Sequence, residues 1–116
     1  MTQWAVRLTR QAEQDFTDIV RWTAQHFGAL QAQRYADTLG QALQALTAGP
    51  DLPDIKKRDE IAPGIRTLHV ARHARKGRHF VVLRVAASDT LDVLRILHDS
   101  MDLARHVDAA STDMEN

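Results

Sequence analysis

Cysteine is absent from this chain of 116 residues, so disulfide bonds, thiolate metal sites and a cysteine nucleophile are excluded. Long apolar stretches are absent too, since none approaches the roughly 18 consecutive residues that span a bilayer. The opening residues 1–10 alternate polar and apolar side chains, a pattern that predicts neither a signal peptide nor a membrane anchor. Stability must therefore come from packing, and we expect a cytoplasmic protein without membrane contact.

An excess of charge of one sign is also lacking, because 15 Lys and Arg balance 15 Asp and Glu. The distribution along the chain is nevertheless uneven. Residues 1–53 hold four positive and five negative charges, residues 54–87 hold nine and three, and residues 88–116 hold two and seven. A strongly basic middle segment can attract phosphates or acidic protein surface, or it can form a solvated face.

The composition that remains is typical of a globular protein, with 44% hydrophobic and 26% charged residues. A chain of this length has room for one hydrophobic core. We expect a single domain over residues 1–107. Residues 108–116 contain no periodic apolar side chains, and we expect them to form a frayed tail.

Apolar periodicity predicts one strand and two helices in the first half of the chain. Trp4, Val6 and Leu8 alternate with other residues, as in a strand with one face buried. Thr9 then offers an N-cap oxygen, and apolar residues recur every three or four positions over residues 12–27 and 32–46. Because only a short link containing Gly28 separates the two helices, they must double back as a hairpin.

Three further strands are predicted over residues 66–71, 80–85 and 91–97, with links short enough for an antiparallel meander. The polar, proline-bearing residues 51–64 are predicted to form an irregular loop. The order β-α-α-β-β-β indicates an α+β fold in which a helical hairpin packs on one face of a mainly antiparallel, four-stranded sheet. The predicted core consists of Phe16, Ile19, Leu39, Leu43, Leu46, Val82 and Leu94.

The densest polar cluster lies in residues 69–79, where Arg75, Lys76 and Arg78 precede a strand. Such cations could bind RNA or an acidic partner. They also fit a basic hairpin tip that keeps a sheet soluble, because the turn has no aromatic side chain on which bases could stack. Three histidines of the cluster match no standard zinc spacing: His69, His73 and His79. We therefore predict no metal site and no cofactor.

Two arginines, Arg84 and Arg95, interrupt apolar strands near the C-terminus. A buried arginine needs a partner, and Asp15, Asp18 or Asp92 could form a structural ion pair. If both arginines face an open groove, they are ligand contacts instead.

The last strand ends at His98, which the alternation of side chains places on the same face as Leu94 and Ile96. His98 next to Asp99 suggests acid–base chemistry, but adjacent strand residues point to opposite faces. The sequence alone therefore does not predict a catalytic dyad.

Four pieces of sequence, in order, resemble the RelE/ParE toxin superfamily over roughly residues 3–106. They are residues 4–9 (WAVRLT) leading to Ala12 and Asp15, residues 64–66 (GIR), residues 78–80 (RHF) and residues 93–102 (VLRILHDSMD). The last piece is closest to the ParE branch. The resemblance implies the fold described above and a toxin of a type II toxin–antitoxin pair.

The ParE branch implies a poison of DNA gyrase that a ParD-like antitoxin neutralises, with no enzymatic step. Trp4 and Trp22 are then candidates for the surface that binds the antitoxin. The candidates for binding the target are Arg75, Lys76, Arg78, Arg84, Arg95 and His98.

The RelE branch is the alternative, and it implies cleavage of messenger RNA on the ribosome. Its members commonly use a C-terminal tyrosine or histidine, whereas the only tyrosine here is Tyr35, on the expected core face of the second helix. In a nuclease the catalytic candidates are Arg66, Arg84, Arg95 and His98, which could stabilise a developing phosphorane. A non-toxic relative that only binds an antitoxin is a third class, because fold and activity can separate.

Overall fold

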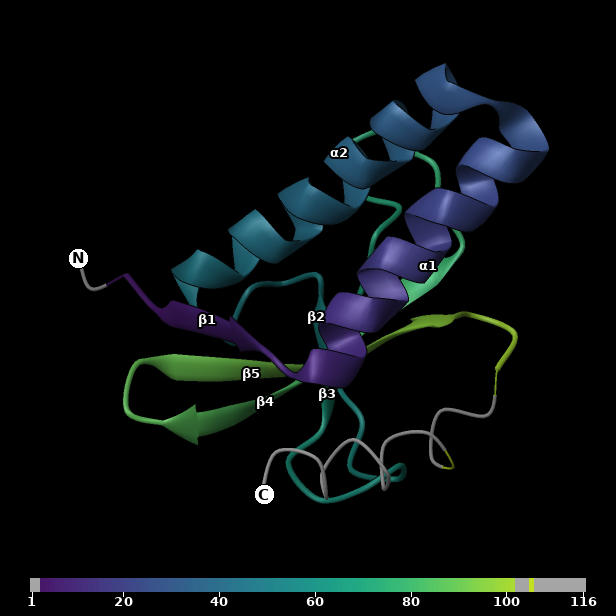
Figure 1. Ribbon diagram of the computed structural model, residues 1–116. Helices are drawn as coiled ribbons and strands as arrows, with labels where there is room; N and C mark the ends of the chain where they lie inside the picture. The colour runs from purple at the N-terminus through teal and green to yellow at the C-terminus, as the bar shows by residue number, and fades with distance from the viewer. Residues whose placement is uncertain (1–2, 102–104, 106–116) are drawn as a thin grey trace.

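The computed structural model describes residues 3–101 and 105. The expected tail, residues 108–116, lies outside them. In chain order the elements are β1 (Ala5–Leu8), α1 (Arg10–Phe27), α2 (Ala29–Ala45), the 3-10 turn η1 (Leu46–Ala48), β2 (Ile55–Lys57), β3 (Arg66–His69), β4 (His79–Ala87) and β5 (Thr90–His98). Figure 1 shows α1 and α2 as an antiparallel hairpin lying across one side of the sheet. No helix among the described residues is long and apolar enough to cross a membrane.

Thr9 fixes where α1 begins and how the helix meets the sheet. Its hydroxyl oxygen accepts the N–H of Ala12 at 2.9 Å, and the same hydroxyl donates to the carbonyl of Leu94 on β5 at 2.8 Å. Gly28 alone separates α1 from α2, and its φ of 92° is a left-handed value that glycine adopts at low cost. The predicted helical hairpin is therefore confirmed.

The sheet has five strands in the order β1-β5-β4-β3-β2, rather than the four predicted. β1 runs parallel to β5, and the other neighbours are antiparallel, as expected. The additional strand is β2, which pairs with β3 inside the segment expected to be an irregular loop. A strand of three residues is too short to show an alternating pattern, so no local pattern predicts it.

Clusters of apolar side chains cover both faces of the sheet. On the helical face, Leu39 and Leu46 are fully buried against β3, β4 and β5, and the partly buried Phe16, Ile19 and Leu43 pack against the same cluster. Val82 and Leu94 are fully buried too, but in a second cluster with Ile65 and Leu97. Because neighbouring residues of a strand alternate sides, this second cluster lies on the face away from the helices, where Ile61 and Ala62 cover it.

A β-bulge explains why β5 departs from simple alternation. Val82 pairs with Arg95 and Leu83 pairs with Val93, so Leu94 is an extra residue without a partner on β4. Leu94 therefore joins the second cluster, whereas Ile96 packs in the cluster beneath the helices. The prediction that these two side chains share a face was wrong, because an extra residue changes the side on which the following residues lie.

Candidate functional site

An open groove of about 1010 Å³ lies between α1 and the ends of β4 and β5. The groove is lined by Asp18, Ile19, Trp22, Thr23, Phe27, Gln31, Tyr35, Lys76, Gly77, Arg78, His79, His98, Ser100 and Met101. Apolar and aromatic side chains come from α1, from Tyr35 of α2 and from Met101. Cationic and imidazole side chains come from the loop before β4 and from the strand ends, so the groove has an apolar wall and a polar end.

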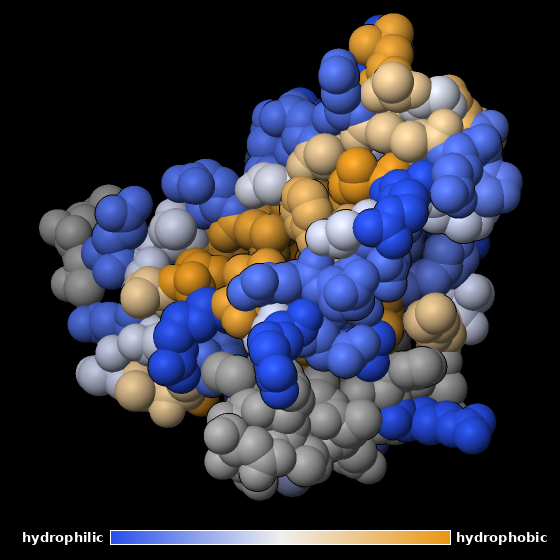
Figure 2. Space-filling model, in the orientation of Figure 1, coloured by the Kyte–Doolittle hydropathy of each residue, from blue (hydrophilic) through white to orange (hydrophobic). Residues whose placement is uncertain are grey.

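Large apolar side chains are exposed along the α1 wall. Trp22 is 53% exposed and Phe27 65% exposed, and their rings meet edge to face at a centroid distance of 5.8 Å. The ring of His26 stacks on Trp22 at 4.1 Å. Figure 2 shows apolar side chains at the tip of the helical hairpin, where Leu30 is also 62% exposed. Exposed apolar surface of this kind is typical of a site that binds another protein.

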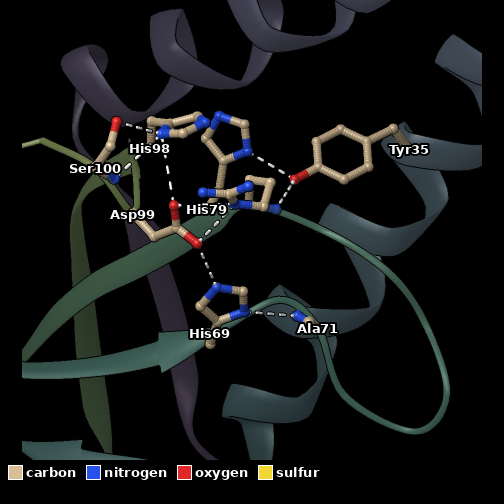
Figure 3. Close-up of polar contacts among 8 residues, drawn as sticks. Tyr35, His69, Ala71, His79, His98, Asp99 and Ser100 are labelled. Carbon is tan, nitrogen blue, oxygen red and sulfur yellow. Dashed lines mark hydrogen bonds and ion pairs between the residues drawn. The ribbon is translucent and has the colours of Figure 1, made fainter.

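Tyr35 connects α2 to the polar end of the groove (Figure 3). Its hydroxyl lies 2.6 Å from Nδ1 of His79 and accepts the backbone N–H of Arg78 at 3.1 Å. Gly77 allows this approach, since a Cβ there would lie 2.5 Å from Cγ2 of Val70 and 3.0 Å from the Tyr35 hydroxyl. The only tyrosine packs against the core, as predicted, but it is only half-buried and its hydroxyl belongs to the site.

Asp99, directly after β5, lies close to three basic side chains at the same end of the groove, and we call this group the Asp99 cluster. Its carboxylate accepts from Nε of Arg78 at 3.1 Å, lies 3.2 Å from Nε2 of His69 and is 3.6 Å from Nδ1 of His98. The hydrogen bonds from Arg78 and His69 lower the pKa of Asp99 to about 2. Asp99 is therefore a carboxylate throughout the physiological range.

His98 makes a closer contact with Ser100, whose hydroxyl is 2.7 Å from Nδ1. The 3.6 Å separation from Asp99 is beyond a hydrogen bond, so these neighbours are not a hydrogen-bonded dyad, in agreement with the strand geometry. Burial, and secondarily the nearby His98, lowers the pKa of His79 to about 4. His79 is neutral at pH 7, and its Nδ1 can accept the Tyr35 hydroxyl hydrogen.

The predicted basic residues do not converge on one centre. Arg75 binds Asp37 and Thr38 of α2, which ties the β3–β4 loop to the hairpin. Arg95 lies against Asp15, with both side chains about 88% buried or more, so it forms the predicted structural ion pair. The other candidates divide between two cavities: Lys76, Arg78 and His98 line the groove, whereas Arg66 and Arg84 line a second pocket.

The two tryptophans are also separated. Trp22 lines the groove, but Trp4 packs partly buried against the core and against Gly49, where an added Cβ would lie 2.8 Å from Nε1 of Trp4. Only Trp22 of the two predicted antitoxin contacts is therefore in the groove. In the part of the chain that the structure describes, no three His, Asp or Glu side chains come together in a way that could hold a metal ion.

Tyr35, His79, Phe27 and Met101 are among the groove residues that sequence reasoning did not identify as site residues. Periodicity marks Tyr35 and Phe27 as core side chains, since it cannot tell a half-buried ring at a groove from one in the interior. The sequence places His79 in the polar cluster, among the rejected metal ligands and in the RHF piece of the family resemblance, but not among the candidate site residues. Its partnership with Tyr35 spans 44 residues, and no local pattern predicts such a contact.

A family model described as the ParE toxin of the type II toxin–antitoxin system parDE matches residues 6–103. The chain belongs to the ParE toxin family. A ParE toxin of Escherichia coli is 35% identical over 83% of this chain and 85% of its own length. A ParE1 toxin of Mycobacterium tuberculosis is 32% identical over 86% of this chain and 94% of its own length. The resemblance to the ParE branch is thereby confirmed.

Solved structures show the same fold as this ParE family member. A chain from the chromosomal ParDE TA system of P. aeruginosa superposes with a TM-score of 0.66 at 20% identity, covering 84% of this chain and 98% of that one. A chain from the toxin–antitoxin complex RelBE2 of Mycobacterium tuberculosis gives 0.53 at 23% identity, covering 83% and 98%. The α+β prediction is confirmed.

Proposed function

We propose that this ParE-family toxin acts in the cytoplasm on DNA gyrase, and that a ParD-like antitoxin neutralises it by placing an amphipathic helix in the groove. The observation that carries the antitoxin part is the exposure of Trp22 and Phe27 beside the groove. Apolar rings that remain in water in the free chain gain free energy when a partner covers them. The solved relatives include a ParDE system and a RelBE2 complex, which supports a partner of this kind.

The charges around the groove support an acidic partner. Lys76 and Arg78 are exposed cations at its polar end, and Asp18 is the acidic residue among the described lining residues. A helix with apolar residues along one face and acidic residues near one end would complement this surface.

Substitution of the two exposed rings tests this antitoxin site. Trp22→Ala combined with Phe27→Ala should weaken antitoxin binding by about thirtyfold or more, because the loss of even one aromatic anchor at an interface costs about 2 kcal/mol. Leu30→Ala is the matched control, since Leu30 is equally exposed but does not line the groove. Isothermal calorimetry with the antitoxin measures both. Equal losses in the two variants would contradict the site.

Two assays on one preparation test the target. The purified chain should inhibit supercoiling by DNA gyrase, and saturating antitoxin should restore it. Messenger RNA on translating ribosomes should remain intact. Expression that leaves growth unchanged, with antitoxin binding intact, would instead assign the chain to the non-toxic class.

The RelE-like alternative has one observation in its favour. His98 and Arg78 lie at the polar end of the groove, where a proton-transfer group beside a cation could act on a phosphodiester. Cleavage of messenger on the ribosome, with normal gyrase activity, would establish this alternative.

A further inference from the structure

The outer edge of β4 is open over its last four residues, 84–87, and we call them the open edge. β3 pairs with β4 only as far as Leu83, whereas β4 pairs with β5 on its other side as far as Ala87. Among the described residues, no backbone hydrogen bond reaches the open edge from the side of β3. The N–H and C=O groups that point outward there are therefore available to another strand.

The chain before β3 turns away from the open edge instead of following it. Both backbone groups of Ile65 bond within the loop of residues 58–65. Gly64 has a φ of 81°, a left-handed value, and its N–H is held by Oδ1 of Asp59 at 2.9 Å. These bonds commit the segment to its own loop. A pocket of about 340 Å³ remains between this loop and the end of β4.

Cations flank the open edge on both faces of the sheet. Arg84 lies on the face away from the helices, two residues after Val82 of the second cluster. Lys57 of β2 lies on the helical face, two residues after Ile55, which packs against the cluster beneath the helices. Both cations line the pocket, so it lies at the edge of the sheet, where the two faces meet.

The charges of Arg84 and Lys57 are not neutralised by the part of the chain that the structure describes, because neither forms an ion pair there. Arg66, the third cation of the pocket, is already paired with Asp51. Arg84 is half-buried, and a partly desolvated guanidinium without an anion destabilises the fold unless a ligand supplies one. Two cations, one on each face, therefore remain available at the open edge.

We propose that the open edge binds an extended segment of a protein partner that carries two consecutive acidic residues. The backbone of this segment pairs with residues 84–87 and adds a strand to the sheet. Neighbouring residues of a strand point to opposite faces, so one carboxylate reaches Lys57 and the next reaches Arg84. A second copy of this chain fits less well, because its own open edge would bring like charges together.

This surface is separate from the one assigned to the antitoxin. The pocket at the open edge shares no lining residue with the groove, which lies at the other end of β4. The proposal therefore does not rest on the antitoxin site or on the gyrase target.

Fluorescence anisotropy tests the proposal with the full chain and a labelled eight-residue peptide of valine and threonine with two central glutamates. Arg84→Gln and Lys57→Gln should each weaken binding by about threefold at low salt, as expected for the loss of one ion pair at a protein surface. Arg21→Gln is the matched control, since it removes an exposed charge of α1 outside both cavities. It should leave the affinity unchanged. Far-UV circular dichroism and thermal melting confirm that the variants fold.

A second peptide separates strand pairing from simple charge attraction. It keeps both glutamates but has proline on either side of them, which removes backbone donors. It should bind about tenfold more weakly. Equal binding of the two peptides would overturn the proposal, as would an affinity that is unchanged in both Arg84→Gln and Lys57→Gln.

Amide hydrogen exchange locates the bound peptide. The outward-pointing amides of residues 84–87 should exchange quickly in the free chain and become protected when the peptide binds, while exchange at Trp22 and Phe27 in the groove stays the same. Protection centred on the groove would overturn the proposal. Protection already present in the free chain would overturn it too, because a second copy or another segment of the same chain would then cover the open edge.

Discussion

Both carboxylate oxygens of Asp15 on α1 accept hydrogen bonds from the guanidinium of Arg95 on β5, at 2.8 and 2.9 Å. Asp15 also accepts the backbone N–H of Ile96 at 2.9 Å. The parallel partner β1 ends its pairing at Val93, so beyond that point no strand within the described residues pairs with this edge of β5. Thr9 and Asp15 of the helical segment take over that role. The pair thus holds the hairpin against the sheet and places α1 beside the groove.

Asp15→Asn should destabilise the fold by about 3 kcal/mol, because it leaves the charge of Arg95 buried without a counter-ion. Urea unfolding followed by fluorescence measures the change. Asp18→Asn is the control, since Asp18 lies on the same helix but pairs only with exposed groups, and its cost should stay below about 0.5 kcal/mol. A combined Asp15→Asn and Arg95→Met variant should recover part of the loss, and no recovery would show that the ion pair is not the cause.

Leu39 and Leu43 of α2 allow the effect of full burial on stability to be compared with that of partial burial. Leu39 is fully buried, and Leu39→Ala should cost about 2–5 kcal/mol through lost transfer energy and the cavity left behind. Leu43 packs against the same cluster while partly exposed, so Leu43→Ala should cost less, towards about 2 kcal/mol. Denaturant unfolding of both variants gives the comparison. A loss below about half a kilocalorie for Leu43→Ala would place Leu43 outside the core.

Acid should destabilise the protein in two steps that belong to His79 and Asp99. The pKa of His79 is about 4 in the fold against 6.5 when unfolded, so the unfolded chain binds the extra proton first and stability falls as pH drops from 6.5 to 4. The pKa of Asp99 is about 2 against 3.8, so its contribution is present above 3.8 and is lost between 3.8 and 2.

His79→Asn isolates the first step, because its amide oxygen can replace Nδ1 as the acceptor for Tyr35 without titrating. The difference in unfolding free energy between pH 7 and pH 4 should shrink by about 2 kcal/mol, a value reduced for the partial exposure of the ring. Urea midpoints of both proteins across this range measure it. Parallel pH profiles for the two proteins would show that His79 is not the titrating group.

The helices were predictable from sequence because their signals are local. Thr9 caps α1, Gly28 breaks the chain between the helices, and the apolar period marks the buried stripe. The bulge at Leu94 and the strand β2 have no local signal, since both depend on which strands pair.

The candidate site was predictable only in part, for the same reason. Arg78 and His98 were identified by residue type and by the family resemblance. Their neighbours Tyr35 and His79 join them through contacts between distant segments, which only the folded chain establishes.

His98→Ala separates a gyrase poison from a nuclease. In a nuclease, His98 would be the proton-transfer group of the groove, and its removal should slow messenger cleavage by about a hundredfold or more. In a poison, His98 contributes only its contacts with His79, Asp99 and Ser100 at the end of β5, so supercoiling inhibition should change by no more than about threefold. We expect the second result. Ser100→Ala is the control for the shape of the strand end, since it removes the hydroxyl at 2.7 Å but leaves the imidazole. Messenger cleavage that disappears in His98→Ala and persists in Ser100→Ala, while gyrase stays active, would replace the gyrase proposal with the nuclease.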